Sequence, residues 1–203
     1  MNTFWKVVVA LLAIGVVVSL FTLFNGSRPV GSENLIGKPL PDFAAPLASG
    51  TQEADANVFT PEQAKAVKST AACDVDLPGA FNSCRDLTGE AILSFWNTTK
   101  SECVSDIATL NAFAAAHPDV NTAAVAFDES ESQVRKFMRS KDWKLPVPID
   151  RDGAVAALYS VAGCPSTYFV RDGEITGVKL GVLSAAQLEK GLKTDSGATG
   201  STN

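Results

Sequence analysis

The chain has 203 residues, a net charge of −5 and 46% hydrophobic residues, which suits one folded domain with flanking segments. It has no basic block of the kind that binds nucleic acids, so we expect no nucleic-acid partner. Its single histidine, His117, precedes Pro118 at a predicted helix end. One histidine argues against a Ser-His-Asp triad or a histidine-based metal site, and we expect neither a metal nor a cofactor.

Residues near the N-terminus predict a membrane segment. Residues 7–24 form an uncharged apolar run, close to the shortest length that spans a bilayer, about 17–25 residues. The following residues lack a small-x-small cleavage site, which favours an uncleaved signal-anchor over a cleaved signal peptide. Lys6 on the short side favours a cytoplasmic location for residues 1–6. We therefore expect a single-pass protein of the cell membrane with an extracytoplasmic C-terminal domain; a cleaved signal is the alternative.

The rest of the chain divides into a polar linker at residues 25–34, a domain at residues 35–193 and a small, polar tail at residues 194–203, predicted to be disordered. The domain contains four cysteines, which allow three pairings in an oxidising compartment: Cys73, Cys84, Cys103 and Cys164.

Cys73 and Cys84 flank a Pro78-Gly79 turn. They are candidates for a small structural disulfide loop, which a chain-entropy model values at roughly 3 kcal/mol. As metal ligands they have no companion ligands in the sequence.

Hydrophobic patterning from residue 91 onward predicts the order β-α-β-α-β-β-α, with an antiparallel hairpin last. Asp172-Gly173 is the hairpin turn, and Asp150 to Gly153 is interpreted as a helix start and not as a calcium loop. Residues 44–90 show no regular pattern except a short helix that Thr60 caps. The expected strands are 91–96, 122–127, 147–149, 166–171 and 174–180, and the expected helices are 61–67, 101–116, 130–140, 154–159 and 184–193.

These residues carry a family likeness. The element order, Phe95-Trp96 at the end of a central strand, the stretch Gly163 to Phe169 and the hairpin 171–174 resemble membrane-anchored thioredoxin-like proteins of the TlpA/redoxin kind. The resemblance implies a thioredoxin-like α/β fold, a central mixed sheet flanked by helices, behind a single N-terminal transmembrane helix.

The resemblance also locates the active site. Family members carry a C-x-x-C motif after Phe-Trp; here Lys100 stands in place of the first cysteine and Cys103 in place of the second. Pro165 matches the family's cis-proline, which implies that Cys103 and Cys164 face each other. A helix N-terminus and Lys100 would both favour a Cys103 thiolate that attacks, with Cys164 resolving.

Three functions remain open. The first is an extracytoplasmic thiol–disulfide oxidoreductase that uses Cys103 and Cys164 with protein thiols or disulfides, or with a membrane electron donor. The second is a redox-inactive binding or assembly module, in which Cys103–Cys164 is a fixed bridge or a pair of inert thiols. The third is a peroxiredoxin-like peroxidase, although Lys100 stands where such enzymes carry threonine and Thr99 lies one residue further back.

Overall fold

The computed structural model describes residues 31–193 and shows a mixed sheet with the strand order β5-β4-β3-β6-β7. Strand β3 runs parallel to β4 and antiparallel to β6, and a smaller sheet pairs β1 with β2. The strands are β1 (Ala44–Pro46), β2 (Ala80–Asn82), β3 (Glu90–Trp96), β4 (Asn121–Phe127), β5 (Ile149–Asp150), β6 (Ser166–Arg171) and β7 (Glu174–Leu180).

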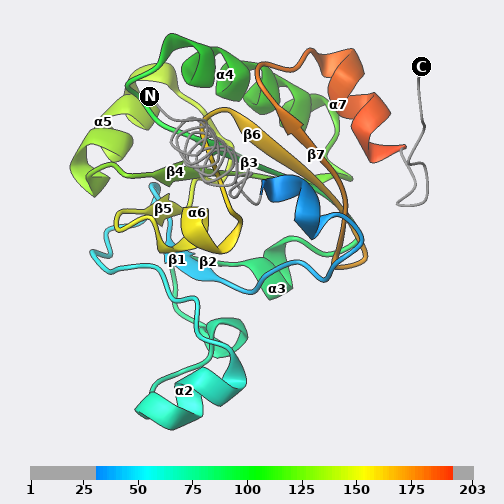
Figure 1. Ribbon diagram of the computed structural model, residues 1–203. Coiled ribbons are helices and arrows are strands. Elements are labelled where there is room, and N and C mark those ends of the chain that lie inside the picture. Colours follow the sequence, from blue (N-terminus) through cyan, green and yellow to red (C-terminus); the bar gives the residue numbers. More distant parts are fainter. Residues whose placement is uncertain (1–30, 194–203) are drawn as a thin grey trace, which may run out of the picture. The chain divides into compact units, whose positions relative to one another are not determined.

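Helices cover both faces of the main sheet, as the sequence predicts (Figure 1). Two short 3-10 helices also occur, η1 (Ser32–Leu35) and η2 (Ala72–Asp74). The α-helices are α2 (Pro61–Val67), α3 (Ser83–Asp86), α4 (Ser101–Ala116), α5 (Glu131–Lys141), α6 (Ala154–Leu158) and α7 (Ala185–Leu192).

Most predicted elements are confirmed to within about two residues, and the missed elements, β1, β2 and α3, lie in the irregular stretch 44–90. Thr60 and Ser184 form capping boxes at the starts of α2 and α7. Within residues 31–193 no helix combines the length and apolar character needed to cross a bilayer. The predicted span 7–24 and the tail 194–203 lie outside the described residues.

Side chains of β3 alternate between two hydrophobic clusters, one on each face of the sheet. Ile92 and Trp96 join the cluster beneath α4, α5 and α7. Leu93 and Phe95 join the cluster beneath α6 that also contains Phe43 and Ala45. Burial on both faces holds β3 firmly in the sheet. Because α4 follows β3 after a short loop, the position of β3 also determines where α4 begins.

The buried face of α4 differs in part from the predicted one. Ile107, Leu110 and Phe113 are buried as expected, whereas Ala108 and Ala112 are exposed. The buried row begins at Cys103 and includes Asp106, so a polar residue occupies a core position that the apolar pattern did not reveal.

Asp106 is the centre of a buried polar network that joins α4 to β3, β6 and the segment before α7. Its Oδ1 accepts a hydrogen bond from the Leu183 amide at 2.8 Å, and its Oδ2 accepts one from Ser94 Oγ at 3.3 Å. Ser94 Oγ also lies 3.1 Å from Thr167 Oγ1. Asp106 is 3% exposed, and this burial raises the pKa of its carboxyl group, although the two hydrogen bonds partly offset the rise.

Helix α7 approaches β6 closely at Gly191. A Cβ atom at this position would lie 2.1 Å from Cζ of Phe169, a ring that is only 1% exposed. Glycine is therefore required here because any side chain would displace the ring or the helix.

Replacing Gly191 by Ala should lower the free energy of unfolding by about 1–3 kcal/mol, because overpacking at Phe169 exceeds the gain in helix propensity. Denaturant unfolding of the full chain in mild detergent measures the change. Gly177→Ala is the matched control, because its Cβ would meet Phe169 Cδ2 at 3.5 Å, an ordinary contact. Equal effects of the two substitutions would refute the steric explanation.

Asp106→Asn should remove one source of pH-dependent stability. Because the folded-state pKa is raised, protonation of Asp106 favours folding, and the contribution of this group to the free energy of unfolding should fall as pH rises from about 3.9 through the raised pKa. Asparagine does not titrate, so the stability of the variant relative to the wild type should increase across that interval and then stay constant.

Denaturant unfolding at a series of pH values measures this difference. Burial also raises the pKa of the Asp150 carboxyl group. This group is present in both proteins, so its effect on stability cancels in the comparison. Parallel stability profiles for the two proteins would show that Asp106 has an ordinary pKa.

Candidate functional site

The site lies where β3 ends and β6 begins, because the register of the two strands places Phe95 opposite Ser166. Helix α4 starts five residues after β3, and Cys103 is the third residue of that helix. Cys164 lies two residues before the start of β6. Residues separated by 61 positions are thereby brought together.

Cys103 and Cys164 form a disulfide with a Cα–Cα distance of 5.5 Å, within the usual range for disulfides. The Cys164–Pro165 peptide bond is cis, as the resemblance implied. Two hydrogen bonds hold this segment: Ser166 Oγ donates to Gly163 O at 2.6 Å, and the Gly181 amide donates to Pro165 O at 3.0 Å.

The two sulfur-bearing residues differ in accessibility. Cys103 is 0% exposed and belongs to the core cluster that contains Trp96 and Ile107. Cys164 is partly exposed and contacts the clusters on both faces of the sheet. Cys164 is therefore the more exposed residue of the pair.

Lys100 and Thr99 lie in the loop between β3 and α4, and both are exposed. Lys100 is the N-cap residue of α4, and its side chain does not cap the helix. Thr99 Oγ1 donates a hydrogen bond to Asn97 Oδ1 at 2.7 Å, which shapes the loop.

Glu129 stabilises the same loop through hydrogen bonds. Its Oε1 accepts hydrogen bonds from the Thr98 amide at 2.7 Å and from Thr98 Oγ1 at 2.5 Å. Glu129 is 7% exposed. Glu129 could not be predicted from the sequence because its partner lies 31 residues away, and a lone acid after a strand carries no local signal.

Asp106 was also not among the site residues predicted from the sequence. It follows Cys103 by three residues, so the two side chains share the buried face of α4. A signal was available: the positions 103, 106, 107, 110 and 113 follow helical spacing, and aspartate is the only charged residue among them.

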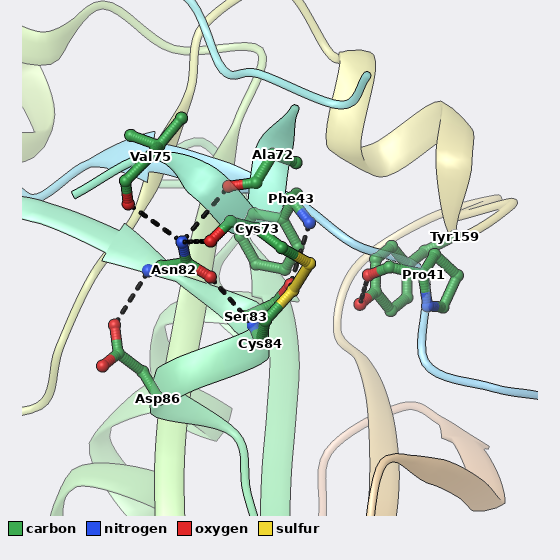
Figure 2. The surroundings of a disulfide bond; sticks show 10 residues. All are labelled: Pro41, Phe43, Ala72, Cys73, Val75, Asn82, Ser83, Cys84, Asp86 and Tyr159. Atoms are coloured by element: carbon green, nitrogen blue, oxygen red, sulfur yellow. Dashed lines mark hydrogen bonds between the residues drawn. A yellow bond between two sulfur atoms is a disulfide. The ribbon is translucent and has the colours of Figure 1, made fainter. Parts of the chain in front are cut away.

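The second disulfide joins Cys73 of η2 to Cys84 of α3, with a Cα–Cα distance of 5.6 Å. Asn82 lies between the two segments and bonds to both, as Figure 2 shows. The spacing around the Pro78-Gly79 turn had made this pairing a candidate. Its surroundings differ from those of Cys103, because Cys73 is exposed to solvent.

Two curated bacterial proteins show how widely the similarity extends. Thiol-disulfide oxidoreductase ResA of Bacillus cereus (strain ZK / E33L) is 25% identical over 189 residues, which cover 91% of each chain. ResA of Oceanobacillus iheyensis is 33% identical over 108 residues, or 51% of this chain and 56% of that protein. The latter alignment thus spans little more than half of its relative.

Solved structures support the fold. A putative thiol:disulfide interchange protein DsbE from Chlorobium tepidum superimposes with a TM-score of 0.58 at 20% identity, covering 77% of this chain and 94% of that one. The exposed lipoprotein thioredoxin Etrx1 of Streptococcus pneumoniae gives 0.56 at 18% identity, covering 75% and 98%. These likenesses establish a thioredoxin-like α/β fold.

The family model described as AhpC/TSA matches residues 36–178. The matched segment includes the strands of the main sheet up to Val178, both residues of the Cys103–Cys164 disulfide and the cis-proline. The chain therefore belongs to the AhpC/TSA family.

Proposed function

We propose that this protein is a thiol–disulfide oxidoreductase whose redox centre is the Cys103–Cys164 disulfide. The observation that carries the proposal is the meeting of the two sulfur atoms at the start of α4, next to a cis-proline and with one side partly open to solvent. The similarity to ResA proteins, which are named thiol-disulfide oxidoreductases, supports the same reaction class.

The difference in burial supports roles for the two cysteines opposite to those that the sequence suggested. A substrate thiolate attacks the partly exposed Cys164 sulfur, forms a mixed disulfide there and releases Cys103 as a thiolate. A second substrate thiol then attacks the substrate sulfur of the mixed disulfide and releases Cys164. The substrate dithiol becomes a disulfide, and the protein gains two electrons and two protons.

The surroundings of Cys103 suit a leaving group. Its position in the first turn of α4 places it near unpaired backbone N–H groups, which stabilise a thiolate. Lys100 adds a positive charge at the same helix end. In the reverse reaction, Cys164 attacks a substrate disulfide and Cys103 resolves the mixed disulfide. The lysine in the first motif position therefore does not prevent thiol–disulfide exchange through this pair.

The substrates in this proposal are protein thiols and disulfides, and a membrane electron donor restores the redox state of the protein. We place the domain of residues 35–193 outside the cytoplasm. An anchor at residues 7–24 would hold it there through the linker 25–34, with residues 1–6 in the cytoplasm and a disordered tail at 194–203. The apolar run in the sequence supports this arrangement.

Trapping with single-cysteine variants tests the roles at this site. In a background with Cys73 and Cys84 replaced by Ser, the Cys103→Ser variant should accumulate a mixed disulfide at Cys164 when mixed with a disulfide peptide, because no resolving thiol remains. The Cys164→Ser variant should react at least roughly tenfold more slowly, because Cys103 is buried. Mass spectrometry of the adducts measures both rates.

Both single variants should also lose insulin-type disulfide reduction. Faster trapping at Cys103 than at Cys164 would reverse the assigned roles. Undiminished reduction in both variants would exclude this pair as the redox centre, and the binding-module alternative would then remain. Peroxide consumption that depends on Cys103 would instead favour a peroxidase.

The membrane anchor makes a separate prediction. The full chain should stay with membranes after an alkaline wash, and a chain that lacks residues 7–24 should not, because the apolar run provides the attachment. Intact mass separates the alternatives, since a cleaved signal peptide would shorten the mature chain. Release of the full-length chain by the wash would contradict an anchor.

A further inference from the structure

The exposed Cys73–Cys84 disulfide lies beside a carboxylate from a distant part of the sequence. Asp42, two residues before the start of β1, offers an oxygen within 4.8 Å of both sulfur atoms. These three residues come from three separate segments of the chain. In the sequence, Cys73 and Cys84 have no companion metal ligand. The fold places Asp42 beside them.

Asn82 fixes the two cysteine-bearing segments independently of the S–S bond. The two hydrogens on its Nδ2 are shared among the carbonyl oxygens of Ala72, Cys73 and Val75, which lie 3.2, 3.1 and 2.9 Å from that nitrogen. Its Oδ1 accepts a hydrogen bond from the Cys84 amide at 3.0 Å, as Figure 2 shows. Asn82 is only 2% exposed, so these bonds should persist after the disulfide opens.

Asp42, Cys73 and Cys84 line a groove of about 570 Å³ that is open to solvent. Asp42 and Asp172 contribute acidic side chains to this groove, and its lining contains no lysine or arginine. A groove with acidic walls attracts cations, and its volume leaves room for water as a further ligand.

We propose that reduction of the Cys73–Cys84 disulfide creates a three-ligand site, formed by Cys73, Cys84 and Asp42, for a thiophilic divalent cation such as Zn²⁺. Two thiolates and one carboxylate, with water in the fourth position, form a donor set that suits tetrahedral zinc. The site shares no residue with the proposed redox centre, so it goes beyond the proposed function and does not depend on it.

The reaction balances with a low-molecular-weight dithiol as the reductant. The dithiol transfers two electrons and two protons to the Cys73–Cys84 bond and itself becomes a cyclic disulfide. Binding of one Zn²⁺ then displaces the two thiol protons to solvent. The positive ion also offsets the repulsion that the Asp42 carboxylate would exert on two thiolates.

The backbone geometry permits this change without a large movement. Zinc–sulfur bonds of about 2.3 Å in a tetrahedron place two sulfur atoms about 3.8 Å apart. The Cα atoms of Cys73 and Cys84 are 5.6 Å apart. Rotation of the two side chains can therefore open the sulfur pair to that separation while Asn82 holds the backbone.

Cadmium titration of the full chain in mild detergent tests the proposal. The Cys103→Ser/Cys164→Ser background removes the other sulfur pair, a dithiol reduces the protein, and the excess is removed anaerobically. Thiolate-to-cadmium charge-transfer absorbance should saturate at one equivalent, and Zn²⁺ should displace the Cd²⁺. The oxidised protein should show no such band.

Asp42→Asn should weaken the affinity for Cd²⁺ by at least roughly tenfold. Even the loss of a group that only hydrogen-bonds to a metal ligand typically weakens metal binding by about that factor. Asp172→Asn is the matched control, because it removes an acid from the same groove but no ligand, and it should leave the affinity unchanged. Absence of the band, an unchanged affinity in Asp42→Asn, or equal losses in both variants would overturn the three-ligand site.

Circular dichroism of the reduced protein completes the test. Loss of folded structure on reduction would also overturn the proposal, since the site requires the arrangement that Asn82 maintains. If the double-serine background itself is unfolded, the same comparison of Asp42→Asn with Asp172→Asn is made in the chain with native Cys103 and Cys164. Failure of this metal site would leave the trapping results at Cys164 unaffected.

Discussion

The pairing of β3 with both β4 and β6 is the constraint on which the rest of the structure depends. The antiparallel register that places Phe95 opposite Ser166 brings the end of one strand to the start of the other. The first turn of α4 and the residue before Pro165 consequently meet at one edge of the sheet, and Cys103 and Cys164 lie within bonding distance. A shift of register by one residue would move every β6 side chain to the opposite face and separate this pair.

Burial then makes the two sulfur atoms unequal. Cys103 faces the core because it occupies the inward row of α4, whereas Cys164 lies between the two hydrophobic clusters and partly reaches solvent. The same inward row carries Asp106, whose carboxylate is satisfied by Ser94 and the Leu183 amide. A polar group in this position is tolerated because its hydrogen bonds tie α4 to the sheet and to the segment before α7.

The two disulfides are the same kind of bond in different surroundings. One joins α4 to the segment before β6 and includes a fully buried cysteine, while the other closes a short loop next to a groove that is open to solvent. In the second, the buried amide of Asn82 organises the backbone, and the disulfide adds to an arrangement that already exists. Accessibility, more than sequence spacing, therefore distinguishes the chemistry open to each pair.

The sequence by itself determined the regular half of the domain. Strand and helix periodicity, the capping residues Thr60 and Ser184 and the Asp172-Gly173 turn are local signals, and the structure reproduces them. Tertiary structure alone decided that Asp42 approaches Cys73 and Cys84, that Glu129 supports the site, and that Cys103 is the buried member of its pair. The physical reason is that hydrogen-bonding periodicity acts between near neighbours in the chain, whereas burial and side-chain contacts depend on how the sheet brings distant segments together.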